Sequence, residues 1–302
     1  MSNFFPQSLF IYLVAIDAGY GTQLITGILL LQNYFGSSDK GFYKFLPWLR
    51  KYRRLSAIGT ALNFGLFSHM IFVWHSEIGV PVYGLFYAAP QYDIPALYAC
   101  LATLVTTIYF VTSAETKFYL KYEQYFNSLN FQGTISTVHE AREEMLTVLW
   151  NDAIHGAIIQ FLFTVGMLSI GLILFERLQP GFTMQMKNYY IILSLAYGIY
   201  ATANMLSLYS TYFADYRSVM IDTMVFAITS TVMCFFDIRF SQSEFYGIGF
   251  LLGCFLFLVV SYVNLRKYTE NLEYEVLSLK PFVPEEPRRT KHFIKLKKQV
   301  KI

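Results

Sequence analysis

Several polar and ionisable side chains interrupt long apolar runs of the sequence. A charged or strongly polar group is costly within a lipid bilayer, so such groups usually line a cavity, couple to an ion or bond to a neighbouring helix. Asp17, His69 and Asp222 lie well inside apolar runs, and hydrogen bonding between helices is the competing interpretation for them. Near the end of a run, a polar side chain that simply reaches the wet interface is the competing interpretation. The candidates for lining a cavity or binding a substrate are Asp17, Asn63, His69, Asp93, Asn204 and Asp222.

The sequence carries no recognisable enzyme or metal-binding motif. It has no Walker A loop, no H-E-x-x-H pattern and no spacing that supports a Ser/His/Asp set. Its three cysteines, Cys100, Cys234 and Cys254, lie in apolar runs outside any metal-ligand spacing, which predicts small buried hydrophobic residues. We therefore predict a protein that is not an enzyme, with no catalytic residue, no metal, no cofactor and no nucleic-acid partner.

Membrane-spanning helices are the elements predicted to position these residues. Charged residues make up 14% of the chain and hydrophobic residues 55%, whereas a soluble domain has about a quarter charged residues. A helix of roughly 20 apolar residues crosses the hydrocarbon core, and the apolar runs lack the alternation of barrel strands. The sequence predicts an all-α polytopic membrane protein with about seven spans, at 8–32, 55–76, 92–113, 152–176, 189–211, 217–237 and 244–265. In the last span, Gly249 and Gly253 form a G-x-x-x-G motif, which indicates close helix packing.

The placement of basic residues predicts how the spans are oriented. Twenty of the 23 Lys and Arg residues fall after spans 1, 3 and 5 or from Arg266 onward, and three fall on the opposite side. By the positive-inside rule, the richer side faces the cytoplasm. We predict a multi-pass protein of the cytoplasmic membrane, with a transmembrane domain over 1–265 and a basic cytoplasmic tail over 266–302. The tail is either solvated or in contact with anionic lipid.

A predicted cytoplasmic helical loop, 114–150, contains the segment ETKFYLKYEQYF at 115–126. Helical spacing gathers its rings on one face, which predicts a helix at the level of the lipid headgroups or, alternatively, rings that stack on sugars. Thr137 and Glu140 fit a capping box, and the helix that they open could continue into the fourth span. The loop is therefore a structured surface where a soluble partner could dock. Its candidate interface residues are Glu115, Phe118, Tyr119, Tyr122, Tyr125 and Arg142.

Six short motifs follow one another along the chain. They are FLPWLRKYRRLSAIGTALNFG near Tyr43, AAPQYDIPAL (88–97), ETKFYLKYEQYF with the following EAREEM, TYFADYR (211–217), YGIGF (246–250) and NLEYEVL (271–277). In their order and separation they resemble the Pel exopolysaccharide transporter family, PelG, over roughly residues 1–277. The chain departs from the family pattern in the span GLFSHMIFVW, where His69 and Met70 stand in the place of an Asp-Lys pair.

The resemblance implies a transporter of the flippase and multidrug-exporter (MOP) superfamily, in which two six-helix lobes surround a cavity. Family members resemble twelve-helix proteins, and this chain resembles the second lobe with one preceding helix. Seven spans would leave the N-terminus outside, so we expect a truncated or partial transporter. The implied substrate is a hexosamine-rich polysaccharide, whose amines could pair with Asp17, Asp93 and Asp222. The implied partners are membrane lipid, a cytoplasmic glycosyltransferase and other membrane subunits of a Pel-type synthase complex.

Two other functions remain open from the sequence. One is a related carrier, either a lipid-linked oligosaccharide flippase or a drug exporter. The other is a membrane scaffold that assembles a glycosyltransferase and transports nothing.

Overall fold

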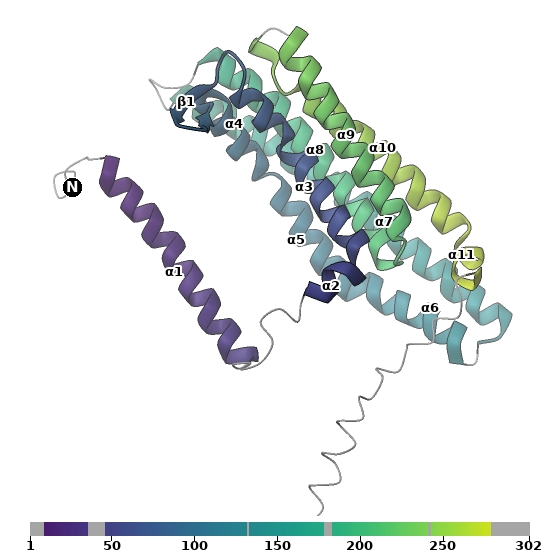
Figure 1. Ribbon diagram of the computed structural model, residues 1–302. Helices are drawn as coiled ribbons and strands as arrows, with labels where there is room; N and C mark the ends of the chain where they lie inside the picture. The colour runs from purple at the N-terminus through teal and green to yellow at the C-terminus, as the bar shows by residue number, and fades with distance from the viewer. Residues whose placement is uncertain (1–8, 36–45, 132, 178–182, 241–242, 279–302) are drawn as a thin grey trace, which may run out of the picture. The chain divides into compact units, whose positions relative to one another are not determined.

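The structure is a computed structural model that describes residues 9–35, 46–131, 133–177, 183–240 and 243–278. Helices form almost all of the described chain (Figure 1), and six helical segments among these residues are long and apolar enough to cross a membrane. The predicted all-α polytopic fold is therefore confirmed. Most of the predicted basic tail, from residue 279 onward, lies outside the described residues.

The chain divides into two compact units, residues 1–53 and 54–302, and each is described by itself. The first unit contains α1 (Leu9–Phe35) and α2 (Leu46–Lys51). Helix α1 covers the first predicted span but is not among the six segments. Its threonine hydroxyls bond within the helix, because Thr22 donates to the Gly19 carbonyl and Thr26 to the Thr22 carbonyl, each at 2.8 Å.

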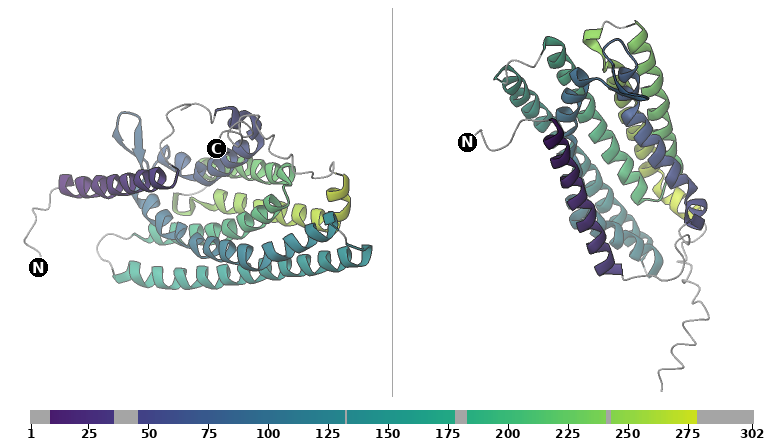
Figure 2. Two further views of the ribbon diagram at one scale, coloured as in Figure 1. Left: turned by 90° about the horizontal axis from the view of Figure 1, so that it is seen from below. Right: turned by 60° about the vertical axis from the view of Figure 1, so that its left-hand side comes forward.

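The second unit is a bundle of long helices. Its elements are α3 (Arg53–Trp74), strands β1 (Val80–Tyr83) and β2 (Phe86–Ala88), α4 (Pro90–Cys100), α5 (Thr103–Ser113), a π-helical turn η1 (Ala114–Phe118), α6 (Tyr119–Phe131), α7 (Ile135–Arg177), α8 (Met184–Tyr212), α9 (Tyr216–Phe240), a 3₁₀ turn η2 (Ser243–Phe245), α10 (Ile248–Glu270) and α11 (Leu272–Ser278). The antiparallel β1–β2 hairpin lies at one end of this bundle, and α6 and α11 lie at the other (Figures 1 and 2). We call these the hairpin end and the α6–α7 end.

Helix α7 is longer than a membrane is thick. Its 43 residues span about 65 Å at 1.5 Å per residue, against about 30 Å for a hydrocarbon core. The predicted continuity of the loop helix with the fourth span is therefore confirmed. The residue that caps this helix is Thr134 and not the predicted Thr137. The hydroxyl of Thr134 accepts the backbone N–H of Thr137 at 3.3 Å. Thr137 instead lies in the first turn and donates its hydroxyl to the Thr134 carbonyl.

Small residues allow α9 and α10 to pack closely. A Cβ on Gly249 would lie 2.4 Å from the carbonyl oxygen of Met233, and one on Gly253 would lie 2.8 Å from the Cα of Ser230. The predicted packing role of the G-x-x-x-G motif is confirmed. Ser230 also joins this seam to α3, since its hydroxyl donates to the Gly65 carbonyl at 2.9 Å.

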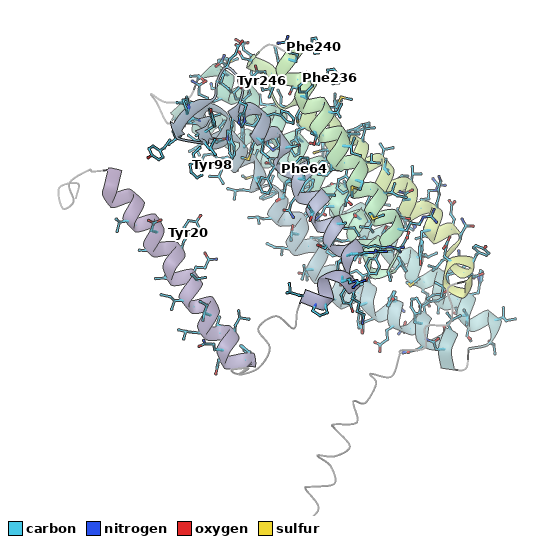
Figure 3. The ribbon with its side chains drawn as sticks, in the orientation of Figure 1. Tyr20, Phe64, Tyr98, Phe236, Phe240 and Tyr246 are labelled. Atoms are coloured by element: carbon cyan, nitrogen blue, oxygen red, sulfur yellow. The ribbon has the colours of Figure 1, made fainter. Side chains whose placement is uncertain are left out.

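Large apolar side chains cover much of the outer surface of the second unit. Phe64 on α3 and Phe236 on α9 are about half exposed, and Figure 3 shows both on the outside of the bundle. Exposing such an apolar surface to water is unfavourable, whereas contact with lipid tails is not. The exposed belt therefore agrees with a bundle immersed in a bilayer.

Candidate functional site

His69 is enclosed where α3 meets α4, α8 and α10. The hydroxyl of Tyr92 lies 2.9 Å from its Nδ1, and that of Tyr197 lies 3.2 Å from its Nε2. The ring also packs on Phe250, with centroids 4.2 Å apart. A neutral imidazole donates through one nitrogen and accepts through the other, so both nitrogens are satisfied within the protein. This geometry favours a helix-joining role for His69 over the lining of a cavity.

Asp222 lies buried between α9 and α10. Asn264 donates its side-chain N–H to Oδ1 at 2.5 Å, which joins the two helices. Oδ2 has no hydrogen-bond partner among the described residues, so the carboxylate keeps one acceptor for a proton, a water molecule or a small cation.

Asp93 holds the hairpin end together. Trp74, at the end of α3, donates its indole N–H to Oδ1 at 2.9 Å, and the backbone N–H of Ala89 donates to Oδ2 at 2.9 Å. The carboxylate thereby closes the hairpin between α3 and α4. Its geometry fits a structural role.

The remaining membrane candidates are dispersed. Asn63 donates to the Gly59 carbonyl of its own helix at 2.8 Å, Asn204 is half-buried on α8, and Asp17 is exposed on α1 in the first unit. None of the six candidates lines either of the two cavities of the second unit described below. The structure therefore does not gather them into one substrate cavity.

The aromatic face of ETKFYLKYEQYF packs inside the protein. Phe118 and Tyr125 are 0% and 1% exposed. The ring of Phe118 lies 5.3 Å from that of Tyr209 and 5.8 Å from that of Phe213, at the end of α8. The prediction that these rings lie in the headgroup layer or stack on sugars is wrong for Phe118 and Tyr125, because other helices of the bundle cover them.

The other interface candidates differ in accessibility. Tyr122 is half-buried against Phe213, whereas Glu115 and Tyr119 are exposed. Arg142 is mostly buried: its guanidinium donates to the carbonyls of residues 269 and 270 at 3.2 and 3.3 Å. Arg142 therefore holds the end of α10, and of these candidates Glu115 and Tyr119 are the most accessible.

Segments far apart in the sequence converge at the α6–α7 end. Lys121 of α6 donates to the Glu144 carboxylate of α7 at 2.7 Å. The Nε of Arg142 lies 3.8 Å from the Glu273 carboxylate of α11, and the ring of Phe213 lies 5.5 Å from that of Tyr268. Four of the motif segments, 115–126, 140–145, 211–217 and 271–277, thus form one structure at this end.

A polar groove of about 750 Å³ lies between the α5–η1–α6 segment and α7. Asp152, 5% exposed, contributes to it and accepts the hydroxyl of Ser113 at 2.5 Å. The ammonium group of Lys117 lies 3.9 Å from the other oxygen of Asp152. Lys117 belongs to the π-helical turn η1, and such turns are frequent at functional sites. The sequence-based candidates did not include this groove.

One signal in the sequence could have revealed the groove. A helical hairpin that turns at Gly133 brings together residues at equal separations before and after the turn. Ser113 lies twenty residues before Gly133 and Asp152 nineteen after it; Lys121 and Glu144 lie twelve before and eleven after. The same symmetry therefore predicts both contacts.

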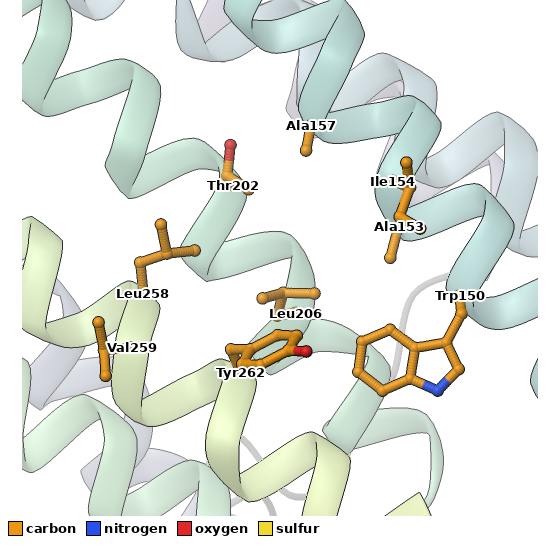
Figure 4. Close-up of a pocket in the computed structure, with 9 residues that line it drawn as sticks. All are labelled: Trp150, Ala153, Ile154, Ala157, Thr202, Leu206, Leu258, Val259 and Tyr262. Atoms are coloured by element: carbon orange, nitrogen blue, oxygen red, sulfur yellow. The ribbon is translucent and has the colours of Figure 1, made fainter.

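A second cavity, of about 490 Å³, lies between α7, α8 and α10 (Figure 4). Its lining is almost entirely apolar, and Trp150 and Tyr262 meet on one side with ring centroids 5.7 Å apart. Such a lining suits hydrocarbon and offers few partners for the hydroxyls of a sugar chain. This cavity is therefore a poor path for a polysaccharide.

Comparison with known proteins identifies one family. The model of PelG, described as "Putative exopolysaccharide Exporter (EPS-E)", matches residues 1–277, which confirms the resemblance seen in the motifs. No curated protein and no solved structure gives a significant match.

Proposed function

The chain belongs to the PelG family of exopolysaccharide exporters, and we propose that it exports a hexosamine-rich polysaccharide across the cytoplasmic membrane. The family match over 1–277 carries this proposal, and the six apolar helical segments found among the described residues supply the membrane part that export needs. Transport requires no covalent chemistry from the protein.

In the proposed orientation, the α6–α7 end faces the cytoplasm. Lys117, Lys121 and Arg142 lie at that end, whereas Arg239 lies at the hairpin end. The positive-inside rule favours this arrangement. Because α11 also lies at the α6–α7 end, the C-terminal region is cytoplasmic in this proposal.

A cytoplasmic glycosyltransferase is the proposed partner at the α6–α7 end. A polymer exported as it is made must pass directly from its synthase, so the two proteins need to be held together. The α6–α7 helix pair supports this, because it extends well beyond the thickness of a hydrocarbon core. Glu115 and Tyr119 are its exposed candidates for contact.

Co-purification tests the docking proposal. The double substitution Glu115→Lys with Tyr119→Ala should weaken capture of the glycosyltransferase of the same complex, because it changes charge and contact area on an exposed surface. Phe64→Ala, on the lipid-facing side of α3, is the control. Equal capture by the variant and the wild type would place the docking surface elsewhere.

Asp17 is the proposed contact for amino sugars among the three acidic candidates. Its side chain is exposed on α1, whereas Asp93 and Asp222 already accept hydrogen bonds from protein groups. Asp17→Asn should lower export without lowering the melting temperature. Unchanged export in that variant would remove Asp17 from the substrate path.

Deletion and complementation test the function as a whole. A strain lacking this chain should release little hexosamine-rich polymer while it still makes the glycosyltransferase, and the restored gene should recover release. Resistance to cationic dyes without a change in polymer would identify a drug exporter. Unchanged release with loss of the glycosyltransferase from the membrane would identify a scaffold.

A further inference from the structure

The polar groove between α6 and α7 lies where two helices leave their apolar runs. Tyr109 of α5 and Ile159 of α7 line it from within those runs. Lys117, Lys121 and His155 line it close to the ends of the same runs. One side of the groove is therefore apolar and the other carries basic side chains. A membrane lipid likewise has apolar tails and a polar headgroup.

The groove offers two lysine ammonium groups to a ligand. The buried carboxylate of Asp152 accepts the hydroxyl of Ser113 at 2.5 Å, and the ammonium group of Lys117 lies 3.9 Å from it. The side chain of Lys117 is 63% exposed and that of Lys121 is 35% exposed. Lys121 pairs with Glu144, but ion pairs at the surface contribute only about 0–1 kcal/mol, so a phosphate can compete for this lysine.

Neutral donors lie beside the two lysines. The side-chain amides of Gln124 and Asn151 line the groove. The Nδ1 of His155 lies 2.6 Å from the carbonyl oxygen of Asn151 in its own helix, so this nitrogen is already engaged and the two amides are the donors offered to a ligand. A phosphate with several oxygen acceptors would find ammonium and amide donors from two helices at this place.

We propose that this groove binds the headgroup of an anionic phospholipid. The phosphate lies between Lys117 and Lys121, and the acyl chains lie along Tyr109 and Ile159 on the apolar side. The apolar wall is the reason to choose a lipid over soluble phosphate, since a phosphate ion gains nothing from it. Basic pockets between membrane helices near the cytoplasmic face commonly bind anionic headgroups.

Bound lipid would fix the α6–α7 pair relative to the membrane surface. The groove contacts α5, η1, α6 and α7 together, so a ligand there stabilises the arrangement of all four. This role depends neither on the identity of the exported polymer nor on the docking partner.

The test is a lipid titration of the full chain in detergent, read by native mass spectrometry. We expect phosphatidylglycerol to bind and phosphatidylcholine to bind weakly. Replacing both lysines, Lys117→Gln with Lys121→Gln, should weaken phosphatidylglycerol binding about 30-fold, which corresponds to about 2 kcal/mol for two lysines. Lys267→Gln, an exposed lysine of α10 at the same end, is the matched control and should leave binding unchanged.

Two further arms keep the outcome decisive. Leu120→Trp fills the groove from a 54% exposed position without changing charge, and it should also weaken binding. Inorganic phosphate at millimolar concentration should compete little. The proposal is overturned if the double variant binds phosphatidylglycerol like the wild type, or if inorganic phosphate displaces the lipid. It is also overturned if Lys267→Gln weakens phosphatidylglycerol binding as much as the double variant does.

Discussion

Gly249→Ala tests how closely α9 and α10 must pack. The added Cβ would lie 2.4 Å from the Met233 carbonyl oxygen and 2.5 Å from its carbonyl carbon. Ordinary contact begins at 3.4 Å, so the two helices must separate by about 1 Å at this point. Because the obstacle is backbone, no side-chain rotation relieves the clash.

The expected cost of Gly249→Ala follows from overpacking. Forcing extra volume into a close-packed interface typically costs 1–3 kcal/mol, and we expect about 2 kcal/mol here. That loss should lower the melting temperature in detergent by about 4–8 °C. Size-exclusion chromatography after heating, with fluorescence detection, measures this change.

Gly166→Ala is the matched control, since a Cβ there meets nothing within 4 Å. Alanine is the better helix former, so the control should keep or raise the melting temperature. Equal melting temperatures for Gly249→Ala and the wild type would refute the close contact of α9 with α10. An equally large fall in the melting temperature of Gly166→Ala would show that the assay does not report helix packing.

Three other substitutions probe separate parts of the bundle. Arg142→Ala removes the donor to two carbonyls at the end of α10, and we expect the free energy of unfolding to fall by about 1–3 kcal/mol and α11 to be cleaved faster by a protease. Arg142→Lys should be intermediate, and an unchanged cleavage rate in Arg142→Ala would contradict this role. Ala214→Gly should raise the melting temperature, because Ala214 has a φ of 58°, where a residue with a Cβ costs roughly 1–2 kcal/mol; a fall would show that the turn is not strained. Asp93→Ala leaves the Trp74 indole and the Ala89 amide without their acceptor, and we expect about 2 kcal/mol of destabilisation with increased cleavage in the hairpin. Loss of export at an unchanged melting temperature would instead assign Asp93 to the substrate.

The main helices could be predicted because their signals are local. Long apolar runs determine where helices cross a bilayer, and the run from Thr134 to Arg177 has no proline, which agrees with one continuous α7. The G-x-x-x-G motif also acts locally, because a missing side chain at Gly249 permits close approach whichever helix is the neighbour.

Partners of polar and aromatic residues could not be predicted, because they come from distant segments. The ring spacing of Phe118 and Tyr125 predicts an apolar face, but it does not distinguish a cover of lipid from one of protein. His69 likewise signals an unusual position, whereas its hydrogen bonds come from Tyr92 and Tyr197, 23 and 128 residues away. These contacts depend on which helices lie side by side.

Transfer of polymer into sealed inside-out membrane vesicles tests the central claim most directly. Vesicles containing the glycosyltransferase and this chain receive a nucleotide-activated hexosamine, and the polymer that survives an added glycosidase is measured. We expect protected polymer in the lumen when the chain is present and none when it is absent. Equal protection in both preparations would contradict export by this chain.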